Sequence, residues 1–182
     1  MEKEKKEFEE KVVEVARVSR TVKGGRRMRF RALVAIGNHK GKVGIGLGKS
    51  NEVAGAVQKA VTEAHKFLID VPIVNDTIPH EIKLKYGSAI VFLKPAAPGT
   101  SVIAGNSVRS VVELAGIKNI LTKSFGSSNK INNVRATYYA LKSLRMIENK
   151  KNVNNDPKQV EIKDKKIDIK EKDEIKSNST KK

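Results

Sequence analysis

Residues 17–50 carry ten lysine and arginine side chains and not one acidic side chain, and this feature constrains the chain more than any other. Apolar residues alternate with the basic ones, and glycines interrupt the pattern. Alternation predicts β-strands, because successive side chains of a strand point to opposite faces. A folded surface of this kind is expected to lie against a polyanion. The basic residues of the segment are Arg17, Arg20, Lys23, Arg26, Arg27, Arg29, Arg31, Lys40, Lys42 and Lys49.

The net charge of the whole chain is +17, and it is concentrated in two interior segments. Residues 17–50 carry +10 and residues 79–150 carry +8, whereas residues 1–16 and 51–78 carry −2 each. A merely solvated surface intersperses both signs, so this concentration favours a nucleic-acid contact. A membrane contact is disfavoured, because it would require an amphipathic basic helix with bulky apolar anchors, and residues 17–50 are rich in β-formers and glycine.

The composition excludes several classes of site. The chain has no cysteine, which excludes disulfides and thiolate metal sites. Its three histidines, His39, His65 and His80, lie in separate segments, so we expect no metal site and no cofactor. The N-terminus is a charged Glu/Lys string, and no apolar run approaches the roughly 18 residues of a membrane span. We therefore expect a cytoplasmic protein.

The first half of the chain has the pattern of an antiparallel meander followed by a helix. Strands are expected at 12–22, 27–36 and 42–48, with a glycine turn at 23–26. The first strand is expected to present one basic face that includes Arg17 and Arg20, and strict alternation places Arg27, Arg29 and Arg31 on one face of the second strand. Ser50 is a candidate N-cap for a helix that ends near residue 70.

The second half is expected to form a separate α/β unit after a linker at 75–79. Strands are expected at 81–86, 89–93 and 119–125. One helix is capped by Asn106 or Ser107 and stopped by Gly116, and a last helix starts at Asn132 or Asn133. The predicted fold class is α+β, and the predicted organisation is a charged extension at 1–11, an RNA-binding domain at 12–78, an α/β domain at 79–149 and a disordered charged tail at 150–182.

The glycine-rich strand imitates a nucleotide-binding loop without matching one. The Walker pattern needs a glycine five positions before Gly48, where the chain has Val43. The dinucleotide fingerprint needs a third glycine where the chain has Lys49. A single RNA phosphate at the N-terminus of the helix after Ser50 remains an interpretation, because free N–H groups there attract anions.

Several motifs, in one order, resemble the bacterial small-subunit ribosomal protein five family. The motif-bearing segments are 21–26, 41–49, 99–105, 112–119, 125–129 and 133–137. The resemblance covers residues 11–144. It implies an N-terminal domain similar to double-stranded-RNA-binding modules, a C-terminal α/β domain and a structural role in the small ribosomal subunit rather than an enzymatic one.

The resemblance also implies partners and sites. The family binds 16S rRNA and lines the messenger-RNA entry path together with protein three, and it affects decoding accuracy. It implies contacts with ribosomal proteins four and eight, with Gly105 and Arg109 near the contact with protein four. The loop at 23–26 is implied to reach an rRNA helix.

The residues themselves leave alternatives open. The predicted RNA-binding set is the ten basic residues above together with Gly24 and Gly25, and the alternative for Arg27, Arg29 and Arg31 is a solvated sheet face. Gly105 and Arg109 are equally compatible with a packing glycine and a surface arginine. Two other functions stay in view: a small-molecule kinase-like enzyme, disfavoured by the lack of magnesium-binding acids near residues 98–105, and a free-standing binder of double-stranded RNA.

Overall fold

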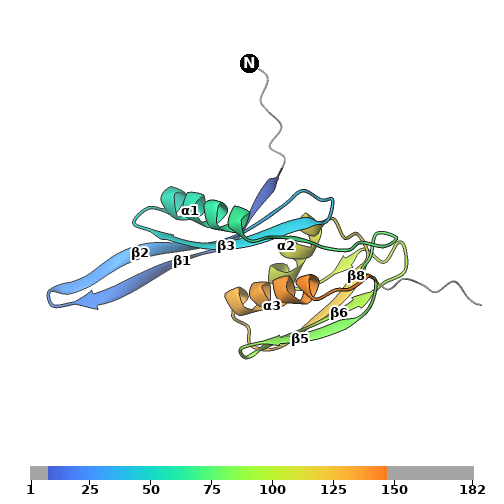
Figure 1. The fold of residues 1–182 in the computed structure, drawn as a ribbon. Helices are drawn as coiled ribbons and strands as arrows, with labels where there is room; N and C mark the ends of the chain where they lie inside the picture. The colour runs from blue at the N-terminus through green and yellow to red at the C-terminus, as the bar shows by residue number, and fades with distance from the viewer. Residues whose placement is uncertain (1–7, 147–182) are drawn as a thin grey trace, which may run out of the picture. The chain divides into compact units, whose positions relative to one another are not determined.

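The computed structural model describes residues 8–146, so the predicted tail at 150–182 and most of the predicted extension at 1–11 lie outside the described residues. The described chain contains two four-stranded sheets, each with its own helices (Figure 1). The first sheet has the order β1-β2-β3-β4 and is antiparallel throughout. Its elements are β1 (Glu9–Val22), β2 (Gly25–Gly37), β3 (Lys42–Ser50), α1 (Val53–Lys66) and β4 (Leu68–Asp70).

The second sheet has the order β5-β6-β8-β7, in which β7 runs parallel to β8 and the other pairs are antiparallel. Its elements are β5 (Ile82–Tyr86), β6 (Ala89–Pro95), β7 (Val102–Ile103), α2 (Asn106–Ala115), β8 (Ile120–Gly126) and α3 (Lys130–Lys142). An antiparallel sheet with a helix, followed by a mixed sheet with two helices, confirms the predicted α+β fold class.

Helix α1 packs closely on β3 because the strand has glycines where the helix has alanines. A Cβ atom added to Gly46 would lie 2.0 Å from the carbonyl oxygen of Ala60. Such a distance leaves no room for any side chain, so the glycine-punctuated pattern of β3 serves helix packing rather than nucleotide binding. Ala56, Ala60 and Ala64 of the helix are fully buried.

The part of β2 at residues 32–36 is buried on both faces, which explains its continuous apolar run. Ala32, Val34 and Ile36 pack with the alanines of α1, whereas Leu33 and Ala35 belong to the apolar cluster that includes α2 and α3. Helices α2 and α3 lie between the two sheets in the ribbon (Figure 1), and both contact strands of the first sheet. The two halves of the described chain therefore share one hydrophobic core.

The β1–β2 hairpin extends beyond the rest of its sheet. β3 pairs with β2 only from Phe30 to Gly37, so nearer the turn the hairpin has two strands alone (Figure 1). We call residues 17–30 the arm, with Arg17 opposite Phe30 at its base. A two-stranded ribbon buries little apolar surface, so the arm is free to present its side chains on both faces.

Several expected element boundaries were wrong. Ser50 pairs with Phe30 as the last residue of β3, and the N-cap of α1 is Glu52, which makes no side-chain capping bond. The N-cap of α2 is Gly105, and α3 begins at Lys130 after Asn129, whose side-chain oxygen accepts a hydrogen bond from the backbone N–H of Ile131. By contrast, Gly116 ends α2 with a φ of 94°, as expected for a left-handed cap.

The structure also adds elements that the pattern did not predict. Strands β4 and β7 are only 3 and 2 residues long, too short for an alternating pattern to be visible. Strand β1 begins at Glu9, before the expected residue 12. The expected linker at 75–79 includes Thr77, which forms an isolated bridge with Val74, and Ile78, whose side chain is buried. Ile78 therefore anchors this segment in the core, whereas Asn75 and Asp76 stay exposed.

Candidate nucleic-acid interface

Pairing of β1 with β2 gathers three arginines on one face of the arm and a fourth, Arg31, just beyond its base. Arg20 lies opposite Arg27, and Arg29 and Arg31 follow at alternate positions of the same strand. Residues directly opposite one another in an antiparallel pair share a face, so Arg20 joins the predicted row of Arg27, Arg29 and Arg31. Lys49 extends this row onto β3, where it lies opposite Arg31. We call Arg20, Arg27, Arg29, Arg31 and Lys49 the arginine face.

The expectation that Arg17 and Arg20 share one basic face was wrong. Three positions separate them, so an uninterrupted strand places them on opposite faces. Arg17 lies opposite Phe30 and Arg26 lies opposite Thr21, which puts both arginines on the other face of the arm. The arm is therefore cationic on both of its faces.

The positive charge of the arm has no counter-charge within the described part of the chain. None of the ion pairs among residues 8–146 involves an arginine of the arm. The side chains from Gly25 to Arg29 are exposed, and Arg31 is half-buried where the arm joins the sheet. Exposed like charges without a partner repel one another until an external anion neutralises them, so the geometry favours a polyanion along the arm.

The tip of the arm is a two-residue turn at Lys23 and Gly24, closed by the pair of Val22 with Gly25. Gly25 has a φ of 144°, which a residue with a side chain rarely adopts. A Cβ added to Gly24 would meet nothing within 4 Å. The tip is thus narrow and open, and the Lys23 and Arg26 side chains flank a backbone that another chain can approach closely.

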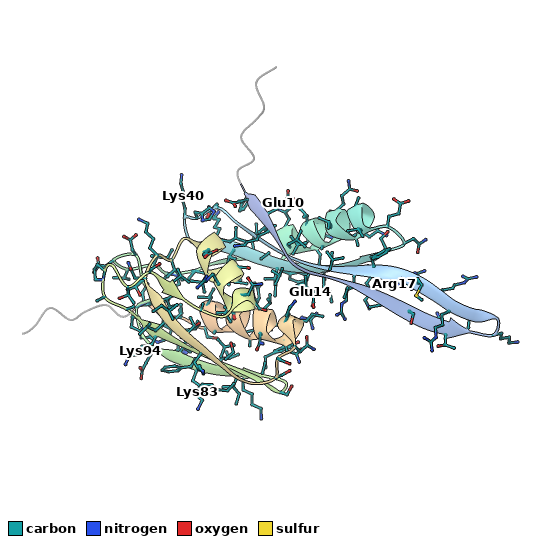
Figure 2. All side chains as sticks on the ribbon, turned by 180° about the vertical axis from the view of Figure 1, so that it is seen from behind. Glu10, Glu14, Arg17, Lys40, Lys83 and Lys94 are labelled. Atoms are coloured by element: carbon teal, nitrogen blue, oxygen red, sulfur yellow. The ribbon has the colours of Figure 1, made fainter. Side chains whose placement is uncertain are left out.

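Lys40 and Lys42 do not belong to the arm. They lie at the end of the first sheet away from the arm, and Figure 2 shows Lys40 far from Arg17. Lys42 lies opposite Asp70 of β4, which places an acidic residue beside it. The predicted RNA-binding set therefore divides into one continuous group on the arm and β3 and a separate pair of lysines.

Gly105 and Arg109 lie at the start of α2, beside a cluster of polar contacts around Glu113. The Glu113 carboxylate is 2.8 Å from the Lys11 ammonium and 4.0 Å from Nε of Arg109. His39 donates from Nδ1 to the Glu113 carbonyl oxygen at 2.8 Å. This cluster ties the first sheet to α2.

Neither the backbone conformation nor the packing of Gly105 requires a glycine. Its φ is −64°, and an added Cβ would meet nothing within 4 Å. The reading of Gly105 as a packing glycine therefore has no support, because the residue is exposed and its backbone conformation suits any side chain.

A second basic surface was missing from the predicted set. The face of the second sheet turned away from α3 carries lysines in register with apolar residues, and among the described residues no element covers it (Figure 2). The exposed lysines are Lys83, Lys85, Lys94 and Lys123, and the exposed apolar residues are Ile103, Leu121 and Phe125. We call these seven residues the outer sheet face. Alternation of lysine with apolar residues in β5 was the signal that could have revealed it.

Other classes of site have no basis in residues 8–146. That part of the chain contains no group of three or more His, Cys, Asp or Glu side chains able to hold a metal ion. No described helix combines the length and apolar character needed to cross a bilayer. The expected absence of a metal site and of a cofactor stays a prediction.

Comparisons with known proteins agree with the motifs. Residues 8–72 match the family described as ribosomal protein S5, N-terminal domain, and residues 84–153 match ribosomal protein S5, C-terminal domain. The chain is similar to proteins named small ribosomal subunit protein uS5. The one from Campylobacter jejuni subsp. jejuni serotype O:6 is 54% identical over 141 residues, which cover 78% of this chain and 96% of that protein.

Relatives from distant bacteria match to a similar degree. The Thermotoga maritima protein of the same name is 52% identical over 138 residues, covering 76% of this chain and 78% of that protein. The Nostoc sp. protein is 50% identical over 146 residues, covering 80% of this chain and 84% of that protein. With both domain families matched in order and half of the aligned residues identical, the chain belongs to the ribosomal protein S5 family.

Proposed function

We propose that the arm is the part of this protein that lies along the phosphate backbone of 16S rRNA. Membership of the S5 family makes the chain a structural constituent of the small ribosomal subunit that binds rRNA, ribosome-bound in the cytoplasm, and not an enzyme. The observation that carries the proposal is the arginine face, whose charge has no partner within residues 8–146.

Arginine suits this role better than lysine. Its guanidinium group is planar and grips phosphate through two parallel hydrogen bonds, whereas lysine acts as a point charge. Neutralising each phosphate also releases condensed counterions, which drives binding. Folded RNA is recognised largely through its shape, its phosphates and its 2′-hydroxyl groups, and a two-stranded ribbon with arginines on both faces fits that mode.

The tip and the base of the arm are proposed to have different contacts. The tip at 23–26 would enter a narrow site on an rRNA helix, since Gly24 leaves its backbone open. Arg17 at the base of the arm and Arg20 farther along it are proposed to contact rRNA or the messenger RNA at its entry path. Lys40, Lys42 and Lys49 complete the proposed RNA-binding set. In this proposal residues 12–78 form the RNA-binding domain and residues 79–149 the second domain.

The second half of the chain is proposed to contact neighbouring ribosomal proteins. We assign Gly105 and Arg109 to the contact with protein four. No neighbouring atom of this chain requires a glycine at position 105, and the lack of a side chain allows a partner to approach the backbone there. The outer sheet face is proposed to contact protein eight or rRNA, since exposed apolar residues beside lysines are typical of interaction surfaces. Contact with protein three at the messenger-RNA entry path, and the influence on decoding accuracy, belong to the same proposal.

The salt dependence of rRNA binding tests the role of the arm. Replacing Arg27, Arg29 and Arg31 together with alanine should weaken binding of the full chain to 16S rRNA. The slope of log K against log salt should fall by about 2 to 3 units if each arginine neutralises one phosphate. The matched control replaces the same three residues with lysine, which keeps the charge and should keep the slope. An alanine variant with an unchanged slope would rule out phosphate contact by these arginines.

A further inference from the structure

A cleft with a cavity volume of about 390 Å³ opens between the first sheet with α1 on one side and β5 with α3 on the other. Its size lies at the lower end of the range for ligand sites, about 300–1,000 Å³. Strands β2 and β3 contribute the apolar wall. The side chains that concern us are Phe67, Tyr86, Arg135, Tyr138, Tyr139 and Lys142.

The cleft gathers aromatic rings that the protein leaves partly uncovered. Tyr86 and Tyr139 stack with ring centroids 5.3 Å apart, and Tyr138 meets Tyr139 edge-on at 5.4 Å. Phe67 is 53% exposed and Tyr139 is 40% exposed. These two rings retain surface on which another flat, apolar group can lie. All the tyrosines of the chain, three in number, line this cleft.

Two cations stand beside these rings. Arg135 donates a hydrogen bond from Nη1 to the Tyr86 hydroxyl oxygen at 3.3 Å, which holds the guanidinium group next to the stacked pair. Neither Arg135 nor Lys142 takes part in an ion pair among the described residues. The one acidic side chain of the lining, Glu63, accepts a hydrogen bond from the backbone N–H of Leu47 at 2.8 Å and so caps the edge of β3.

We propose that this cleft receives one unstacked nucleotide of RNA, with its base on Tyr139 and Phe67 and its phosphate at Arg135 and Lys142. The inference rests on the proposed function, because it takes rRNA as the source of the nucleotide. Exposed bases of RNA bind proteins by stacking on aromatic side chains and arginine planes. Stacking tolerates any base, since every base has a π-face.

The chemistry of the lining favours a nucleotide over a peptide. An acidic peptide would neutralise the two cations but leave the aromatic faces uncovered. An apolar helix would cover the rings and bury Arg135 and Lys142 without a counter-charge, which is costly. A nucleotide supplies a flat base and an anionic phosphate together.

The fluorescence of the protein gives a direct test, because the chain has no tryptophan and its only tyrosines line the cleft. The full chain is titrated with a uridine hexamer at low salt, with correction for absorption by the RNA. We expect saturable quenching of tyrosine fluorescence. Tyr139→Leu should weaken the binding that causes this quenching by roughly 5- to 150-fold, as the loss of one stacked base predicts. Tyr139→Phe keeps the ring and is the matched control, with affinity expected within about twofold of the parent.

A second variant tests the cleft independently, in case Tyr139→Leu does not fold. Lys142 is exposed, so Lys142→Gln should fold normally. It should weaken binding of the uridine hexamer and lower the salt slope of that binding by about one unit. The variant with alanine at Arg27, Arg29 and Arg31 should lose affinity for folded rRNA yet keep the hexamer quenching, which separates the cleft from the arm.

Three results would overturn the inference. The first is the absence of quenching at millimolar hexamer. The second is unchanged hexamer affinity in both Tyr139→Leu and Lys142→Gln. The third is equal quenching by a hexaglutamate peptide, which would assign the cleft to an acidic protein segment instead of RNA.

Discussion

Arg20 and Arg27 lie directly opposite one another across the two-stranded arm, on the same face and without an acidic neighbour in the segment between them. Like charges at directly opposed positions of a sheet destabilise the pairing. A chain selected for the stability of the free protein alone would place a charge of the other sign at one of the two positions. The proposed contact with RNA would remove this stability cost.

Removing this repulsion should make the free protein more stable while weakening its binding to rRNA. Arg27→Thr puts a good β-former opposite Arg20 and should raise the free energy of unfolding of the free protein by about 0.2–1 kcal/mol at low salt. The same change should weaken rRNA binding and lower its salt slope by about one unit. Urea unfolding with and without added salt, beside an rRNA titration, measures both effects. Arg27→Lys keeps the opposed charges and should change the unfolding energy little. A threonine variant that is less stable at low salt would contradict this account of the pair.

Close packing of α1 on β3 predicts a strong asymmetry between two glycines. Gly46→Ala places a Cβ 2.0 Å from the Ala60 carbonyl oxygen, and overpacking of this kind costs at least about 1–3 kcal/mol. Gly24→Ala adds the same methyl group at the arm tip, where nothing lies within 4 Å, and should change stability by no more than about 0.5 kcal/mol. Chemical denaturation of the two variants is the comparison, and equal stabilities would show that the helix can move away from the strand without cost.

The shared core predicts that the two halves of the described chain unfold together. Leu114 of α2 is 1% exposed and belongs to the same apolar cluster as Leu33 of β2. Leu114→Ala should lower the free energy of unfolding by about 2–5 kcal/mol while keeping a single transition. Native-state hydrogen exchange of β2 and β6 amides should report the same loss. The control is Leu121→Ala, because Leu121 is at the surface. Two separated transitions in the parent protein would contradict the shared core.

The free energy of unfolding should depend on pH through the ionisation of the Tyr138 phenol. Burial raises the pKa of the Tyr138 phenol above its usual value of 10.0, and the nearby Tyr139 adds to the rise. The folded state therefore holds this proton more tightly than the unfolded state does. The resulting stabilisation is present below pH 10 and is lost as the pH rises through the raised pKa.

Tyr138→Phe removes the titrating group and should flatten this part of the profile. Urea unfolding of parent and variant between about pH 8 and pH 11 brackets the ordinary tyrosine pKa. The difference between the two proteins should stay constant below pH 10 and change above it. A difference that is constant over the whole range would show that the Tyr138 hydroxyl titrates alike in both states.

Local sequence patterns predicted the parts of the fold that depend on local physics. Strict alternation around Arg29 identified a strand and placed the arginine row, and the hairpin turn fell within the expected glycine segment. Gly116 was correctly expected to end α2, since a left-handed cap is a property of a single residue. The motifs that resemble the ribosomal protein five family were confirmed by the family matches.

Other features could not be predicted because distant segments decide them. Ser50 was expected to cap a helix, but its pairing with Phe30 extends β3 through it. The split of Arg17 from Arg20 follows from spacing and could have been recognised, whereas the direct opposition of Arg20 and Arg27 needs the strand register. The register also brings lysines of β5, β6 and β8 onto one outer sheet face.

The sequence by itself determined that this protein carries a cationic, strand-forming segment without acids, because charge and alternation are properties of consecutive residues. Only the tertiary structure decided which arginines face each other, that the two halves share a core, and that Phe67, just after α1, meets Tyr86, Arg135 and Tyr139 around one cleft. These relationships join residues far apart in the chain, and they exist only where packing and strand register bring those residues together.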